Sequence, residues 1–530
     1  MAAAVQGHVR WVLAAGLAAV LCALVAAPAE GREGPPPRPE TRQVMFVGNN
    51  WDGTADIIDA KTFEKLARIN TIPDKAERMA EIMTSPDKLA FFLAIREAVG
   101  EGNDQYTDDM FSSHDGRFMY VSRPSFADVV GIDLRTQEIV WRFPMEGYRA
   151  DHMGISPGGT RLLVSDSTAN IVHVIDPRTG AGIGRFESGD SPHENNYTED
   201  GTKIFHASIG RVYTPTDRSI LGLVRDTSKG ERYLQVVDSR TNEILKRWDI
   251  GKKLEEAGYP EMSSAVRPMA VAPGERFVYL QVSFFHGYVE FDLEQEKVTD
   301  VVELPISEEA KDIPREQYLL DSAHHGLAIN EAGTKLCVAG TMSDYAAIVN
   351  RATKQPKLFD IGRKPYWSTN DHDSEHCWVS SSGDDQVVVL DYETEKEVAT
   401  IKVGDHPQRV RAAAIRRNLV EELPQATDSR APRVSASGVG SRCRSASFVM
   451  RVTVDDQSSL RSAQVAVGSR LLRSTKAKSF RVRVPVHSQS RRQHRVRIRV
   501  TDSAGNTQRR VVRFSRCARG SQGRTLSLTG

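Results

Sequence analysis

Cysteine is scarce in this chain, and the spacing of the few cysteines excludes the common cysteine-dependent sites. The 530 residues contain five cysteines, and no two of them form the C-x-x-C motif that structural zinc sites usually use. A C-x-x-C-H motif for covalent haem attachment is also absent. The sequence therefore argues against a structural zinc site and against a haem c domain.

An uninterrupted apolar run of 17 residues, Trp11 to Ala27, lies near the N-terminus behind the positive charge of Arg10. The A-x-A sequence Ala27-Pro28-Ala29 follows it, and this order is typical of a secretory signal peptide. We therefore expect a signal peptide at 1–29, a stiff Pro-rich linker at 30–42, and a secreted or cell-surface protein outside the bacterial cytoplasm. The alternative is an uncleaved anchor, because about 17 residues is the lower limit for spanning a bilayer. Membrane contact would then be limited to this segment.

The net charge of +1 hides two regions of opposite charge. Residues 424–530 contain 23 Lys and Arg against 4 Asp and Glu, whereas residues 1–423 contain 47 against 65. Such asymmetry indicates two domains with different partners.

A two-part sequence motif recurs seven times: a short apolar strand is followed by a turn that is mostly of the form Asp-x-x-Thr. The strand copies begin at Phe46, Tyr120, Leu163, Ile204, Tyr279, Cys337 and Trp378. The turn copies begin at Asp59, Asp133, Asp176, Asp238, Asp292, Asn350 and Asp391. We interpret the turn motif as structural, because Asp and Thr side chains accept hydrogen bonds from nearby backbone N–H groups. A period of about 40 residues with short strands predicts an all-β fold, a seven-bladed β-propeller over residues 43–415.

The two ends of this region complement each other. Residues 43–47 match the second strand of a repeat, and residues 404–410 supply the innermost strand that is missing there. We therefore predict that a strand from the far end closes the ring, which removes free sheet edges.

Several segments carry a family resemblance: Tyr120-Val121-Ser122-Arg123, Val174 to Thr179, Glu199-Asp200-Gly201-Thr202 and Gly404-Asp405-His406-Pro407. They resemble the YVTN-type (YncE-like) β-propeller repeat family over about 370 residues. The resemblance implies the fold more than a function, because relatives include surface-layer proteins, phosphogluconolactonase-like propellers and parts of nitrous oxide and haem d1 nitrite reductases. This chain has Asp and Tyr where a copper cluster would need a fuller histidine ring.

Strand counting places the long interruptions of the repeats on one face: residues 70–107, 209–230, 249–265 and 303–323. Insertions confined to one face indicate a binding surface. Within a helical insertion at 71–106, we expect one helix over Lys75–Met83 and another that starts at Pro86 and ends at Gly100. We interpret these helices as packed on the ring, and the alternative is a lid over the central channel.

Polar residues gather at the start of the inner strands on the same face. Alignment of the repeats on their turn glycines gives one equivalent position to Asp108, Asp151, His193, His325, Tyr366 and Gln408. Beside them stand Asp109, His152, Glu194 and His324. We expect a solvated funnel lined by polar side chains. Because carboxylates and imidazoles converge there, the alternatives are a divalent metal, a small ligand or catalysis. The candidates for such a site are Asp108, Asp151, His152, His193, Glu194, His324, His325 and Tyr366.

Four cysteines remain after the expected cleavage. Cys443 and Cys517 bracket the basic region, and we predict that they form a disulfide in an oxidising compartment. Cys337 and Cys377 lie on equivalent strands of neighbouring repeats, one position out of phase. For this pair we expect two buried thiols, with a disulfide as the alternative.

Residues 433–517 alternate apolar and polar positions, as in Phe480 to Val484. This pattern predicts an Ig-like β-sandwich, with a linker at 416–432 before it and a disordered tail at 518–530 after it. Thr501 to Asn506 also resembles the D-x-A-G-N turn of bacterial Ig-like modules. Arginine fills the outward positions, and we interpret this face as a solubilising surface. The alternatives are adhesion to an anionic cell-wall polymer and docking on the acidic propeller. Because aromatic residues are few here, we expect no nucleic acid partner.

Together these features favour a secreted binding protein, rather than an enzyme, with a site for a small ligand or a protein partner on the insertion-bearing face. Two alternatives remain open. One is a metal-dependent, lactonase-like hydrolase centred on Asp151, His193 and His325, and the other is a structural surface-layer protein. A divalent metal at the channel mouth is the one cofactor that these residues suggest.

Overall fold

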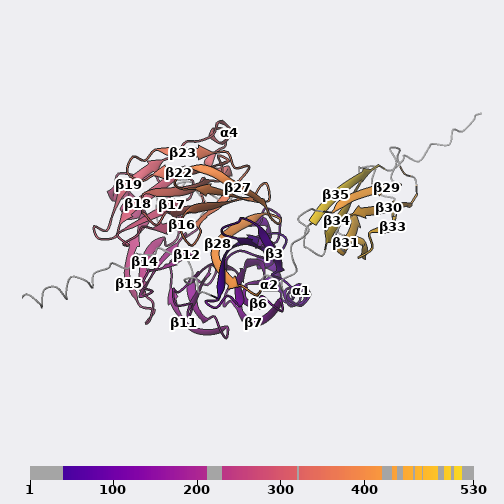
Figure 1. The fold of residues 1–530 in the computed structure, drawn as a ribbon, viewed down its shortest axis with the longest axis horizontal. Coiled ribbons are helices and arrows are strands. Elements are labelled where there is room, and N and C mark those ends of the chain that lie inside the picture. The colour runs from indigo at the N-terminus through magenta and orange to yellow at the C-terminus, as the bar shows by residue number, and fades with distance from the viewer. Residues whose placement is uncertain are drawn as a thin grey trace, which may run out of the picture.

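The computed structural model describes residues 40–211, 229–318, 322–419, 432–438, 444, 446–456, 460–467, 470–486, 494–502 and 507–515. The fold is all-β, with repeated four-stranded antiparallel sheets and a few short helices (Figure 1). The predicted signal peptide, most of the first linker, the tail, Cys443 and Cys517 lie outside the described residues. Within the described part, no helix has the length and apolar character needed to cross a membrane.

Residues 41–416 form seven four-stranded sheets, counted over the described parts of that range. Their strands are β1 (Thr41–Asn49), β2 (Thr54–Asp59), β3 (Lys65–Asn70), β4 (Met110–Ser112), β5 (Phe118–Arg123), β6 (Asp128–Asp133), β7 (Glu138–Pro144), β8 (Ala150–Ile155), β9 (Leu162–Asp166), β10 (Ile171–Asp176), β11 (Ala181–Glu187), β12 (Pro192–Tyr197), β13 (Lys203–Ser208), β14 (Tyr233–Asp238), β15 (Ile244–Asp249), β16 (Val266–Val271), β17 (Phe277–Val282), β18 (Gly287–Asp292), β19 (Lys297–Glu303), β20 (Leu327–Ile329), β21 (Lys335–Gly340), β22 (Tyr345–Asn350), β23 (Pro356–Phe359), β24 (Pro365–Asn370), β25 (His376–Ser381), β26 (Gln386–Asp391), β27 (Lys396–Lys402) and β28 (Pro407–Arg416).

Burial changes across each sheet from the inner strands to the outer one. In one sheet, every residue of β8 and β9 is buried, whereas β11 is largely exposed. The buried strands pack on neighbouring sheets and form most of the apolar core. The Asp-x-x-Thr turns have the structural role expected of them. In the turn after β6, for example, Asp133 Oδ1 accepts hydrogen bonds from the backbone N–H groups of Arg135 and Thr136.

The first strand of each sheet contacts its counterparts in the two adjacent sheets. These contacts run from β4 through β8, β12, β16, β20 and β24 to β28, and β28 also contacts β4. Residues from all seven of these strands line a single cavity of about 130 Å³. The arrangement is therefore propeller-like, with the inner strands around a common centre.

The two ends of the repeat region share one sheet, as the sequence predicts. β28 pairs antiparallel with β1, so that Val47 faces Val410 and Val44 faces Ala413. Both strands are almost entirely buried. The last strand therefore supplies the innermost position of the sheet that begins the chain's repeats.

The first insertion is a pair of helices, α1 (Lys75–Met83) and α2 (Pro86–Ala98), and both match their predicted spans closely. Ile82 and Phe92 pack against Phe126 in the 3₁₀ helix η1 (Pro124–Phe126), and Phe91 stacks on Tyr148. The pair is therefore packed on the adjacent sheet, as expected. The other described helices are α3 (Ile250–Glu256), α4 (Glu308–Lys311) and the 3₁₀ helix η2 (Arg315–Gln317).

Two further antiparallel sheets follow, in the orders β29-β30-β33 and β32-β31-β34-β35, and Figure 1 draws them as a separate group. Both sheets contribute to one core that includes Met450, Val465, Val482 and Ile498. Their bounds are β29 (Arg433–Ser437), β30 (Phe448–Asp455), β31 (Leu460–Val467), β32 (Arg470–Thr475), β33 (Ser479–Val484), β34 (His494–Asp502) and β35 (Thr507–Phe514).

One expectation about the cysteines is wrong. Cys337 on β21 and Cys377 on β25 form a disulfide rather than two buried thiols. The two strands belong to adjacent sheets, and the Cα atoms are 6.4 Å apart, which is within disulfide range. The offset of one position in the sequence repeat does not prevent this approach, because the two residues meet across the interface between sheets rather than along one strand.

Candidate functional site

Seven of the eight candidate site residues lie together at the starts of the inner strands. With Arg409 they form the set that we call the central cluster: Asp108, Asp151, His152, His193, Glu194, His325, Tyr366 and Arg409. β8, β12, β24 and β28 carry most of them, while Asp108 and His325 lie just before β4 and β20. None is more than 5% exposed, so the expectation of a solvated funnel is wrong. Charged groups buried to this extent need partners, which makes their contacts informative.

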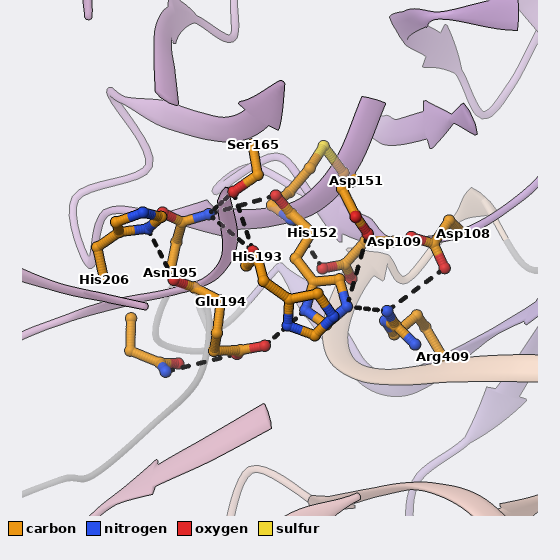
Figure 2. A network of polar contacts seen from close by, with 12 residues as sticks. Asp108, Asp109, Asp151, His152, Ser165, His193, Glu194, Asn195, His206 and Arg409 are labelled. Carbon is orange, nitrogen blue, oxygen red and sulfur yellow. Dashed lines mark hydrogen bonds and ion pairs between the residues drawn. The ribbon is translucent and has the colours of Figure 1, made fainter. Parts of the chain in front are cut away.

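His152 lies at the middle of the cluster, between a carboxylate and a guanidinium (Figure 2). Its Nδ1 is 2.5 Å from Glu194 Oε2, so this nitrogen carries the proton and donates a hydrogen bond to the carboxylate. Its Nε2 is then the acceptor for a hydrogen bond from Arg409 Nη2. The imidazole of His193 lies against that of His152, with ring centroids 3.8 Å apart.

Asp151 has one oxygen held and one oxygen free of hydrogen bonds. Its Oδ2 accepts from Arg149 Nη1 and from Ser167 Oγ at 2.7 Å. Its buried Oδ1 has no hydrogen-bond partner and lies 3.7 Å from Nε2 of His152. The buried Nδ1 of His193 also lacks a hydrogen-bond partner.

Asp108 and Arg409 form a loose ion pair at the side of the cluster. Arg409 Nη2 is 3.6 Å from Asp108 Oδ1, while Asp108 Oδ2 and Arg409 Nε and Nη1 make no hydrogen bond. The guanidinium carbon lies 4.3 Å from the ring centre of Trp367. Burial raises the pKa of Asp108 to about 6, although the charge of Arg409 opposes this effect. A carboxyl group whose pKa lies near the working pH is suited to general acid–base catalysis.

His325 and Tyr366 complete the cluster as a stacked pair, with ring centroids 4.0 Å apart. Nδ1 of His325 is buried without a hydrogen-bond partner. Burial is the main cause that lowers the pKa of His152, His193 and His325 well below the ordinary histidine value, and nearby arginines add to it. These imidazoles are therefore neutral at neutral pH.

Two residues beside the predicted ring are engaged elsewhere. His324, the eighth candidate, is not part of the cluster: its Nε2 is 3.1 Å from the hydroxyl of Tyr345, and its ring packs edge-on against His286. Asp109 accepts two hydrogen bonds of 2.8 Å from Arg411, and this guanidinium holds the pKa of Asp109 below its ordinary value against the effect of burial. Both residues therefore stabilise the surrounding structure rather than face the cluster.

The sequence analysis missed Arg409, which contacts His152 and Asp108, and Arg411, which pairs with the neighbouring Asp109. Both lie on β28, the inner strand that the far end of the chain supplies, and they alternate with Gln408 and Val410. Because alternate residues of a strand point to one face, two arginines spaced by two on a predicted inner strand were the available signal.

A match to the G-x-S-x-G motif at Gly154 to Gly158 also has a structural explanation. Ser156 Oγ accepts hydrogen bonds of 3.1 Å from the backbone N–H groups of Thr160 and Arg161, in the turn between β8 and β9. A serine nucleophile of the hydrolase type would instead need a strand-to-helix turn. Ser156 is therefore a turn residue.

Comparisons with known proteins add little to this description. No protein-family model matches the chain, and no curated protein matches it. Among solved structures, a hydrazine synthase from Kuenenia stuttgartiensis is similar over 59% of this chain and 96% of its own, with 13% identity and a TM-score of 0.44. A similarity at this level is too distant to carry an argument about fold details or function.

Proposed function

We propose that this chain is an exported β-propeller that binds a small ligand at the central cluster. One observation carries the proposal: buried polar atoms without hydrogen bonds converge on one place from several sheets. They are Asp108 Oδ2, Asp151 Oδ1, His193 Nδ1, His325 Nδ1 and Arg409 Nε and Nη1. Each buried polar group without a partner costs about 1–3 kcal/mol, and folded proteins rarely tolerate several together. A ligand that bonds to these atoms would remove the cost.

The finer fold assignment belongs to the same proposal. The seven sheets would be the blades of a YVTN-type propeller, which the repeat pattern and the contacts from β4 round to β28 both support. The two C-terminal sheets would form an Ig-like sandwich, supported by their strand order and shared core. An exported location rests on the N-terminal sequence alone.

Native and denaturing mass spectrometry of the full purified chain tests the binding proposal. We expect an extra mass that is retained in the native measurement and lost on denaturation, and we expect the double variant D108N/H325A to lose it while staying folded. The proposal is wrong if the native chain carries no extra mass and its Tm does not respond to inorganic phosphate, small carboxylates or divalent metals.

A hydrolase is the second candidate function, and the pKa of Asp108 favours it. A carboxyl group with a pKa of about 6 exchanges protons readily near neutral pH. Assay with a chromogenic lactone tests this candidate. Activity should rise as the pH passes through about 6 if Asp108 acts as a base, and D108N should abolish the rise; absence of turnover in the wild type would leave binding as the function.

A further inference from the structure

We propose that Asp151, His152 and His193 bind a divalent first-row transition metal, with Zn²⁺ as the representative ion. The inference rests on the proposed function, because it names the ligand class of the central cluster. Two imidazoles and one carboxylate are a donor set typical of zinc and other divalent transition metals in open, catalytic-type sites.

The three side chains already present their donor atoms to a common point. One ligand atom from each lies within 4.8 Å of the other two, and Asp151 Oδ1 is 3.7 Å from His152 Nε2. Ligands at zinc distance in a tetrahedron lie about 3.3 Å apart, so small side-chain shifts suffice to close the site. All three residues are buried, and no more than 4% of any of them is exposed.

Outer hydrogen bonds orient two of the three ligands toward that point. Glu194 accepts a hydrogen bond from the protonated Nδ1 of His152, which leaves the lone pair of Nε2 on the side of Asp151. Arg149 and Ser167 hold Oδ2 of Asp151, which leaves Oδ1 for the metal. A carboxylate behind a ligating histidine is the usual arrangement at protein metal sites, where it fixes the ring and its tautomer.

Arg409 competes with a metal for His152. Its guanidinium donates to Nε2 of His152, so it must withdraw for that nitrogen to bind a cation. Asp108 can accept the displaced guanidinium, because its Oδ1 is 3.6 Å from Arg409 Nη2 and its Oδ2 has no hydrogen-bond partner. We therefore infer that metal binding transfers Arg409 from His152 to Asp108.

The first experiment measures metal content and affinity of the full chain. After removal of metals with a chelator, Zn²⁺ is titrated by calorimetry and Co²⁺ by its visible absorption. We expect one metal per chain, and at least a 100-fold weaker affinity in H193A and in the nearly isosteric D151N. H324Q is the matched control, because His324 is equally buried and adjacent to His325 but points elsewhere; it should bind like the wild type.

The second experiment uses R409Q, which removes both the competing hydrogen bond and a like charge. A metal site predicts tighter Zn²⁺ binding, by roughly tenfold, in a variant that keeps its far-UV circular dichroism. Weaker or unchanged binding in R409Q, or undiminished binding in both D151N and H193A, would overturn the inference.

The two proposals fail separately. A folded wild type that binds neither Zn²⁺ nor Co²⁺ overturns the metal site, and if native mass spectrometry still finds a ligand lost in D108N/H325A, the binding function stands. If neither a metal nor any other ligand is found, both are wrong.

Discussion

Buried charges at the centre of this molecule depend on their ion-pair partners. Asp109 is fully buried and accepts two hydrogen bonds from Arg411, a third from the backbone of Met153 and a fourth from Met110 N–H. Removing one partner of a buried ion pair leaves an uncompensated charge, at a cost of about 3–5 kcal/mol. We expect D109N to lower the free energy of unfolding in denaturant by about this amount. The double variant D109N/R411M should recover part of the loss, and an additive double variant would contradict the pairing.

His376 gives a prediction about pH. Its hydrogen bond of 2.6 Å to Asp371, together with Asp391, raises the pKa of His376 above its ordinary value, despite burial. The stabilisation from this pair is therefore complete below about pH 6.5 and is lost as the pH rises through the higher pKa of the folded state. The difference in Tm between the wild type and H376Q should shrink from pH 6 to pH 9.

His206 is the control for that measurement. Burial lowers the pKa of His206 to about 3, so this ring is neutral at both pH values. The Tm difference between the wild type and H206Q should not change between pH 6 and pH 9. A parallel change in both variants would assign the pH dependence to other groups.

At the level of strands and helices, the sequence predicted regular features well and irregular ones poorly. The turn motif, the two inserted helices and the pairing of β28 with β1 follow from local patterns, such as the proline at the first position of α2. The position of the central cluster was predictable for the same reason, because it depends on alignment of repeats. The burial of the central cluster was not predictable, because no sequence pattern in the inner strands shows which residues cover them. The pairing of Cys337 with Cys377 depends on the register between two sheets, which neither strand encodes by itself.

The disulfide between β21 and β25 connects two adjacent sheets covalently, in addition to contacts such as the ion pair of 2.8 Å between Lys335 and Glu395. It spans a separation of 40 residues, and closing a loop of that length is worth about 3–4 kcal/mol in the chain-entropy account. We expect C337A/C377A to lower the free energy of unfolding by about 2–4 kcal/mol. Dithiothreitol should lower the Tm of the wild type and leave that of the variant unchanged. Equal sensitivity of both proteins would show that the bond does not contribute.

For the whole molecule, the separation of charge between its two parts suggests different tasks. Within the described residues, Asp405 forms an ion pair of 2.6 Å with Arg509 of β35, and both side chains are partly exposed. An exposed pair of this kind contributes only about 0–1 kcal/mol, so it does not hold the basic sheets against the acidic ones. Arg481, Arg483 and Arg495 on β33 and β34 have exposed side chains that an anionic partner can reach.

We propose that this partner is the anionic polymer of a bacterial cell wall, and salt dependence tests it. The full chain should bind purified cell-wall sacculi at about 0.1 M NaCl and be released at about 1 M, because the Debye length falls from about 10 Å to about 3 Å. Replacing four outward arginines by Gln, R481Q/R483Q/R495Q/R497Q, should remove most of the binding. The control R240Q/K252Q/K297Q/K396Q makes the same charge change at exposed positions between residues 41 and 416 and should bind normally. Equal loss in both variants would indicate attraction by net charge alone, and binding that resists salt would exclude an electrostatic site on the basic sheets.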